Sequence, residues 1–122
     1  MHRTTVDDLP HIQQLWPVFE RLVGLPGRRM YGCVDVQHNT YAACTPVRVD
    51  DEPSGLGLGL GKLPGGAFLH GRLIGDPPQL YERIGPGMAE LEAMVEVDRR
   101  RPLVEYYRRY NEIELWVPVI DQ

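Results

Sequence analysis

Hydrophobic residues recur at helical spacing near the start of the chain. Asp8 suits an N-cap position, and the stripe that follows predicts one amphipathic helix: Leu9, Ile12, Leu15, Trp16, Phe19, Leu22 and Val23. Because Pro17 removes a helical donor, we expect a kink there or a separate first turn. A matching stripe runs from Leu80 to Val95, and Gly85-Pro86-Gly87 is expected to break it into two pieces.

Strand-like segments follow each predicted helix. Residues 29–36 and 41–49 predict one β-hairpin, and residues 103–109 and 112–120 predict a second. Both turns contain Asn, which tolerates the left-handed conformation that tight turns require. A further apolar stretch, residues 67–74, predicts a strand ahead of the second helix.

The two sets of elements form an internal repeat. A gapless shift of 72 residues aligns residues 9–50 with residues 81–122 and gives eight identities in 42 positions. Copy one covers about residues 1–50, a Gly-rich linker covers 51–66, and copy two covers 67–122 of a single domain. The same shift places the counterpart of the strand 67–74 almost wholly before Met1. We therefore expect the first copy to lack its opening strand.

A missing strand has consequences for the sheet edge. Unpaired backbone groups at an edge are usually covered or paired in natural proteins. We expect a homodimer that covers this edge, or a pocket that is open on that side, unless a longer natural chain supplies the strand.

The Gly-rich linker resembles a phosphate-binding loop only superficially. Leu56 and Leu63 stand where that motif needs a Gly and a Ser or Thr. A mobile linker is the better interpretation.

The second hairpin carries the candidate chemistry. A turn centred on Tyr110-Asn111 pairs Glu105 with Trp116 and Tyr107 with Glu114. Alternation then predicts a helix-facing side with Val104, Tyr106, Leu115, Val117 and Val119, and an opposite side with Leu103, Glu105, Tyr107, Glu114, Trp116 and Pro118. In the first hairpin, the side that faces away from the helices is predicted to carry Tyr31, Cys33, Cys44 and Pro46.

Carboxylates interleaved with aromatic residues suit a cavity for a cation with apolar bulk. Aromatic faces attract a positive charge, and a partly buried carboxylate supplies the counter-charge. The alternative is the solvent-exposed side of an open sheet.

Composition narrows the function classes. The 122 residues carry a formal charge of −4, which disfavours a phosphate-backbone binder and hence a nucleic-acid partner. No signal peptide and no membrane-spanning run is visible, so we expect a cytoplasmic protein without a membrane partner. The single Ser and the single Lys, Ser54 and Lys62, leave few candidates for a serine hydrolase or a Schiff-base enzyme. The His and Cys spacings predict no metal site and no cofactor, and Cys33 and Cys44 are expected as reduced thiols that face a cavity.

Taken in order, several short segments resemble the GyrI-like small-molecule-binding domain, the effector-binding module of AraC-type and MerR-type multidrug regulators, here in a stand-alone form. These segments are Leu15-Trp16 with Phe19, Tyr31-Gly32, Tyr41-Ala42-Ala43, 63–68, Gly75, Arg101-Pro102 with Glu105-Tyr106, and 114–119. The resemblance implies an α+β fold of two pseudo-symmetric strand–helix–strand–strand units that form a curved antiparallel sheet with two helices, here with the first strand missing.

The resemblance also implies an aromatic-lined pocket with a glutamate at its base that binds lipophilic cations. Glu105 matches that glutamate, and the other candidate ligand-binding residues are Trp116, Tyr107, Glu114, Tyr31, Trp16 and Phe68. The leading interpretation is a binding protein for bulky lipophilic, cationic small molecules, acting by sequestration or effector sensing. The alternative is a hydrolase of cyclopropane-containing toxins, with Glu105 as general base and Tyr107 as orienting hydroxyl. A weaker alternative is an inhibitor of a DNA-processing enzyme such as gyrase.

Overall fold

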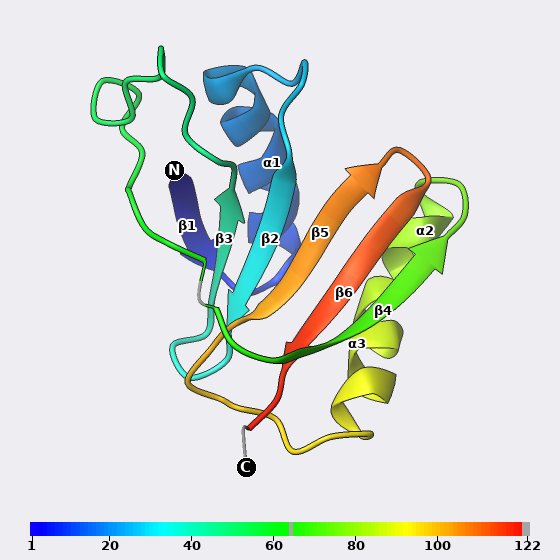
Figure 1. The fold of residues 1–122 in the computed structure, drawn as a ribbon. Helices are drawn as coiled ribbons and strands as arrows, with labels where there is room; N and C mark the ends of the chain where they lie inside the picture. Colours follow the sequence, from blue (N-terminus) through cyan, green and yellow to red (C-terminus); the bar gives the residue numbers. More distant parts are fainter. Residues whose placement is uncertain (64, 121–122) are drawn as a thin grey trace.

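A single six-stranded antiparallel sheet, in the order β1-β3-β2-β5-β6-β4, organises the chain. The computed structural model describes residues 1–63 and 65–120. Figure 1 shows the helices on one face of the sheet, with α1 behind the β1–β3–β2 half and α2 and α3 behind the other half. The α+β class and the curved antiparallel sheet are confirmed. The elements are β1 (His2–Val6), α1 (Leu9–Val23), β2 (Met30–Asp35), β3 (Thr40–Cys44), β4 (Phe68–Ile74), α2 (Gln79–Glu82), α3 (Ile84–Glu92), β5 (Leu103–Arg109) and β6 (Glu112–Pro118).

The helices follow the predicted stripes, with one shifted break. The Asp8 carboxylate accepts a hydrogen bond from the His11 amide at 2.9 Å and caps α1, which continues through Pro17 without a separate first turn. The second helical segment breaks at Arg83 instead of at Gly85-Pro86-Gly87. Pro86 lies in the first turn of α3, where an amide has no intrahelical acceptor and its loss costs nothing. No helix of the described residues is long and apolar enough to cross a bilayer.

The opening strand is present, so the expectation of a missing first strand is wrong. Residues His2–Val6 pair with β3 in antiparallel register, with Thr4 opposite Ala42. The strand-to-helix connection has two residues in the first copy and four in the second, 75–78. The second helical segment also begins two residues earlier than the shift of 72 requires, because Gln79 then falls on position 7 whereas α1 begins at Leu9. Together these two differences displace the strands by four residues, which a gapless shift cannot follow.

The linker covers the outer edge of the sheet instead of being wholly mobile. His2 and Gly59 exchange two backbone hydrogen bonds of 2.9 Å each, and Leu58 is buried in the core beside Met1. The sheet edge that suggested a homodimer is therefore formed by β1 and partly paired by the linker. The homodimer itself stays a prediction without this support.

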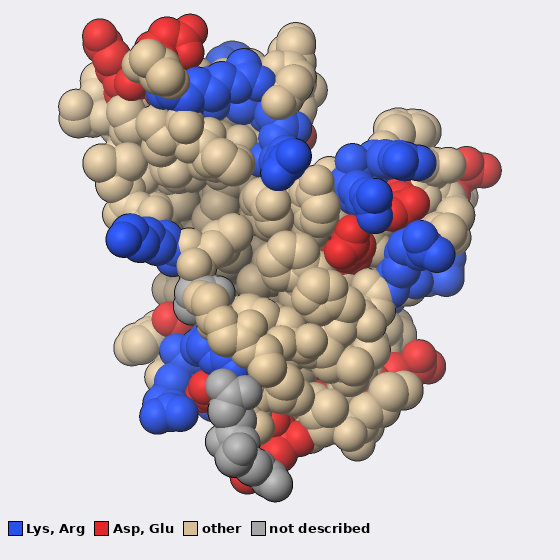
Figure 2. Space-filling view, viewed as in Figure 1, with Lys and Arg blue, Asp and Glu red and all other residues tan. Residues whose placement is uncertain are grey.

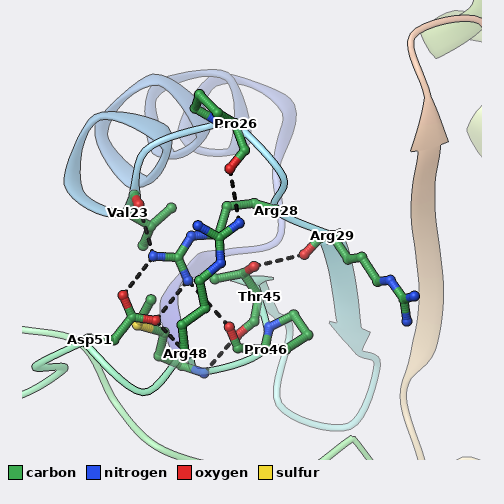
Figure 3. A network of polar contacts seen from close by, with 9 residues as sticks. Val23, Pro26, Arg28, Arg29, Thr45, Pro46, Arg48 and Asp51 are labelled. Atoms are coloured by element: carbon green, nitrogen blue, oxygen red, sulfur yellow. Dashed lines mark hydrogen bonds and ion pairs between the residues drawn. The ribbon is translucent and has the colours of Figure 1, made fainter.

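An arginine cluster fastens the start of the linker to the end of α1 (Figure 3). The Arg28 guanidinium donates to both carboxylate oxygens of Asp51, at 2.6 and 2.7 Å, and to the Val23 carbonyl at 3.0 Å. Arg48 donates to the Pro26 carbonyl at 2.9 Å. Paired geometry of this kind fixes the linker more firmly than a single contact does.

A β-bulge in β5 overturns the predicted hairpin register. Arg109 pairs with Glu112 as the predicted turn requires, but Tyr107 pairs with Ile113 and Glu105 with Leu115. The extra residue is Arg108, and a shift of one residue exchanges the faces of a strand. The predicted pairs of Glu105 with Trp116 and of Tyr107 with Glu114 are therefore wrong.

The bulge redistributes the residues of the second hairpin. Leu115 and Val117 face the helices as predicted, and Leu103 joins them in the core instead of Val104 and Tyr106. Glu105 and Tyr107 share this helix-facing side. Glu114, Trp116 and Pro118 lie on the opposite, helix-free side with Val104 and Tyr106.

Candidate ligand-binding site

A cavity of about 910 Å³ opens on the helix-facing side of the sheet, between α1 and the α2–α3 segment. Ile12 and Trp16 line it from α1, while Tyr81 and Ile84 line it from α2 and α3. Its floor consists of strand residues from both halves of the repeat: Met30, Tyr41, Glu105 and Tyr107. The two copies therefore build this cavity together.

Glu105 is held at the floor by two tyrosine hydroxyls. Its side chain is buried, and Oε1 accepts hydrogen bonds from the hydroxyls of Tyr41 at 2.8 Å and Tyr107 at 2.7 Å. The Trp16 indole Nε1–H donates in turn to the Tyr41 hydroxyl at 3.1 Å. The chain of donors ends on a carboxylate, and this fixes the orientation of the three aromatic side chains around it.

Gly32 makes this arrangement possible. It lies opposite both Glu105 on β5 and Ala43 on β3. A Cβ atom at Gly32 would clash with the Tyr41 hydroxyl and would lie 2.8 Å from Glu105 Oε1. The absent side chain is the space through which the Tyr41 hydroxyl crosses β2 to reach the carboxylate.

The aromatic rings pack edge to face around the floor. The rings of Trp16 and Tyr107 lie 5.2 Å apart, and Tyr81 approaches Tyr107 at 6.4 Å from the opposite wall. Edge-to-face packing leaves ring faces available to a neighbour, and ring faces carry the negative side of the quadrupole.

The electrostatics of the cavity favour a positive guest. Burial raises the pKa of Glu105, although the hydroxyls of Tyr107 and Tyr41 act in the opposite direction. Burial and the charge of Glu105 hold the pKa values of Tyr41 and Tyr107 well above the ordinary value, so both remain hydrogen-bond donors. Asp7, Asp8 and Glu20 also line the cavity. Of its three basic residues, Arg28 is paired with Asp51, Arg108 is paired with Glu114, and Arg109 is exposed to solvent.

The structure brings together three of the seven candidate residues and separates the other four. Glu105, Tyr107 and Trp16 line the cavity. The other four candidates lie on the helix-free side: Trp116, Glu114, Phe68 and Tyr31. There the Trp116 indole donates a hydrogen bond to Glu114 at 3.1 Å, and its ring lies beside Phe68. The ring of Tyr31 stacks on that of Tyr106, with centroids 4.7 Å apart. The one-residue shift at the bulge accounts for the division of the second hairpin.

Sequence reasoning missed Tyr41 and Tyr81. Tyr41 lies in the segment Tyr41-Ala42-Ala43 that carried part of the resemblance, and its alternation with the buried Ala43 could have placed it on the helix-facing side. Tyr81 lies within the predicted apolar stripe from Leu80 to Val95, and only the packing of the two halves shows that it faces Tyr107.

Comparisons with known proteins identify the fold. No protein-family model and no curated protein sequence matches the chain. An integron cassette protein from the mobile metagenome of Vibrio cholerae superposes with a TM-score of 0.71 at 15% identity, over 98% of this chain and 87% of that one. The protein SAV2435, solved bound to tetraphenylphosphonium, superposes with a TM-score of 0.66 at 13% identity, over 98% and 86% of the two chains. At these identities, the likeness establishes a common fold.

Proposed function

We propose that this protein binds bulky lipophilic cations in the cavity between α1 and α2–α3, as a stand-alone GyrI-like binding protein that sequesters or senses them. The observation that carries the proposal is the buried Glu105 carboxylate, held by two tyrosine hydroxyls at the floor of an aromatic-lined cavity. A buried carboxylate without a basic partner is costly, and a cationic guest supplies that partner.

Two further points support the proposal. The cavity volume of about 910 Å³ lies within the range of sites for drug-sized ligands. One of the proteins that share the fold, SAV2435, was solved with tetraphenylphosphonium, a lipophilic cation.

The test is a titration with tetraphenylphosphonium, read from tryptophan fluorescence. The chain has two tryptophans, Trp16 in the cavity and Trp116 on the opposite side of the sheet. A Trp116→Phe protein keeps only the cavity reporter, and its fluorescence should respond to the ligand. A Trp16→Phe protein should respond much less.

The matched variants are Glu105→Gln and Glu90→Gln. Glu105→Gln should weaken binding by about 1–3 kcal/mol, the scale of a charge-assisted buried contact. Glu90→Gln changes the same group at an exposed position of α3 outside the cavity and should leave the affinity unchanged. Equal affinity of Glu105→Gln and the wild-type protein, or an equal loss in both variants, would remove Glu105 from the proposed site. The neutral analogue triphenylphosphine oxide should bind more weakly than the cation.

The hydrolase alternative rests on one contact, the 2.7 Å hydrogen bond from the Tyr107 hydroxyl to Glu105. A carboxylate with a raised pKa, next to a hydroxyl group that could orient a water molecule, suits the role of a general base. Incubation with an electrophilic cyclopropane substrate separates the two functions, because a binding protein leaves the substrate intact. Multiple turnovers that disappear in Glu105→Gln would establish the hydrolase instead.

A further inference from the structure

A second cavity, of about 480 Å³, lies on the helix-free side of the sheet. Strands β2 and β3 form its floor, and residues 61–63 of the linker and the segment around Pro102 line its sides. Figure 2 shows the molecule from this side, with the surface hollowed beside the linker. The function proposed above does not use this cavity.

Two cysteines meet in this cavity. Cys33 and Cys44 are free thiols, both partly exposed and both part of the lining. Their sulfur atoms lie 3.8 Å apart. The strand register explains the meeting, because Cys33 lies opposite Ala42 and Cys44 is the next residue of β3 on the same face.

The two thiols differ in acidity. The hydrogen-bonding contact between the two sulfurs and the nearby N-terminal ammonium lower the pKa of Cys44, while the same contact and burial raise the pKa of Cys33. Cys44 is therefore the more acidic of the two thiols, and Cys33 is the one that holds its proton more strongly.

The geometry favours one bridging atom over a direct bond between the sulfurs. Diagonal neighbours on adjacent strands are about 7–8 Å apart, beyond the roughly 4.4–6.8 Å between Cα atoms that a disulfide usually spans. Sulfur atoms that lie 3.8 Å apart can both bond to one atom between them after only a small movement of the two side chains. The described residues contain no group of three or more His, Cys, Asp or Glu suited to a metal ion. An atom that binds between the two sulfurs would therefore be held by these two sulfurs alone.

The remaining walls are largely apolar. The ring of Tyr31 and the side chains of Pro46, Val47, Leu63 and Pro102 line the space around the two sulfurs. These walls suit an organic substituent on the bridging atom, and the cavity volume provides room for an aromatic ring.

We propose that Cys33 and Cys44 form a dithiol site for trivalent organoarsenicals of the type R–As=O. The Cys44 sulfur attacks arsenic, and the proton of the Cys44 thiol passes to the arsenic-bound oxygen, which becomes a hydroxyl group. The Cys33 sulfur then forms the second As–S bond, its proton joins the departing hydroxide, and one water leaves. Two As–S bonds replace the As=O bond, arsenic remains trivalent, and no oxidant is required.

The experiment uses the reduced full-length protein and phenylarsine oxide. Intact-protein mass spectrometry should show one adduct with the mass of the reagent less one water. An excess of a small dithiol should reverse the adduct, whereas the same concentration of thiol groups from a monothiol should not. Cys33→Ser and Cys44→Ser should each weaken binding at least about 100-fold, the lower end of the gain from joining two binding events in one site.

Two controls make the result decisive. Cys33→Ser and Cys44→Ser should bind tetraphenylphosphonium as the wild-type protein does, so failure of arsenical binding and failure of cation binding are distinguishable. Far-ultraviolet circular dichroism of the serine variants shows whether they are folded, and alkylation of the wild-type protein with iodoacetamide should block adduct formation without relying on a substitution. Adducts of equal stability in either single variant, or equal reversal by the monothiol, would overturn the proposal. Inorganic arsenite, which lacks the organic group, should bind more weakly, and equal affinity would exclude a role for the apolar walls.

Discussion

Gly32 determines whether the buried carboxylate can be shared by two tyrosines. Its missing side chain leaves the path along which the Tyr41 hydroxyl reaches Glu105. Any larger residue forces Tyr41, a fully buried ring, to move. This single position therefore links the backbone of β2 to the chemistry of the cavity floor.

Gly32→Ala should destabilise the fold by about 1–3 kcal/mol, the usual cost of overpacking a core, and should weaken binding of tetraphenylphosphonium. Urea unfolding and the fluorescence titration measure the two effects. Gly65→Ala is the matched control, because a Cβ there meets nothing within 4 Å. Unchanged stability and affinity in Gly32→Ala would show that Tyr41 does not need its present position.

The pKa of Glu105 predicts the pH dependence of cation binding. Burial raises this pKa, so the neutral carboxyl persists to a higher pH than in an ordinary glutamate. Affinity for tetraphenylphosphonium should fall as the pH is lowered through this pKa, with a midpoint above the ordinary glutamate value. Titrations at a series of pH values measure it, and in Glu105→Gln the same series should be flat. A midpoint at or below the ordinary value would mean that a different group controls binding.

The raised pKa of Glu105 also determines how the free energy of unfolding changes with pH. A carboxyl whose folded pKa lies above the unfolded one contributes stability below the unfolded pKa and loses that contribution as the pH rises through the folded pKa. Ionisation of Glu105 in the unliganded protein therefore lowers the free energy of unfolding, and such a cost is common for residues that bind a charged guest.

At the scale of elements, the linker is the segment in which the structure differs most from the sequence-based expectation. Leu58 packs in the core of the first half with 7% exposure, whereas Leu60, two residues on, is 71% exposed. Between them Gly59 pairs with His2 at the edge of the sheet. The segment therefore behaves as a short edge strand with one inward residue.

Leu58→Ala should cost about 2–5 kcal/mol, as for other buried leucines, while Leu60→Ala should change the free energy of unfolding by less than about 0.5 kcal/mol. Chemical unfolding of the two variants under the same conditions provides the comparison. Similar small effects at both positions would mean that the linker does not pack against the core in solution.

The elements themselves were largely predictable from the sequence, but their register was not. The apolar stripe after Asp8 and the Asn-containing turn of the first hairpin both gave correct elements, and Asn39 adopts the expected positive φ of 53°. Nothing in the sequence around Arg108 indicates a bulge, yet this residue determines on which face of the sheet Glu105 lies.

β1 was not predicted because Arg3, Thr4 and Thr5 form no apolar run, although the two β-branched threonines favour a strand.

The candidate site was therefore predictable in its chemistry and only partly in its membership. Glu105, Tyr107 and Trp16 came from aromatic and acidic residue types and from the resemblance. Tyr81 joins them only because two helical segments from different copies lie over the same part of the sheet, and this depends on tertiary packing instead of local pattern.

At the scale of the whole molecule, two hydrophobic cores meet beneath the larger cavity. One lies under α1 and the other under α2 and α3, and Val34 and Tyr107 pack against both. Charged anchors tie down the connecting segments. Asp51 accepts hydrogen bonds from Arg28, and Asp98 accepts them from Arg100 and Arg101.

These anchors predict a loss of stability in acid. Hydrogen bonds from Arg100 and Arg101 lower the pKa of Asp98 from 3.8 to about 2, and those from Arg28 lower the pKa of Asp51. A lowered folded pKa contributes stability that is present above the unfolded pKa and is lost as the pH falls through the folded one. The free energy of unfolding should therefore decrease between pH 4 and pH 2.

Asp98→Asn should be less stable than the wild-type protein at pH 7 and should lose less stability between pH 4 and pH 2. Asp76→Asn, at an exposed position, is the matched control and should follow the wild-type curve. Urea midpoints from circular dichroism at each pH give both curves. Parallel curves for Asp98→Asn and the wild-type protein would exclude Asp98 as a source of the acid sensitivity.

Successive residues of β2 belong alternately to two different cavities. Met30 lines the larger cavity and Gly32 borders its floor, whereas Tyr31 and Cys33 line the smaller one on the reverse side. A mutagenic library that varies only even-numbered codons of this strand thus alters one chamber, and a library of odd-numbered codons alters the other. The strand works as a partition wall, and each chamber can be remodelled without touching the side chains of its neighbour.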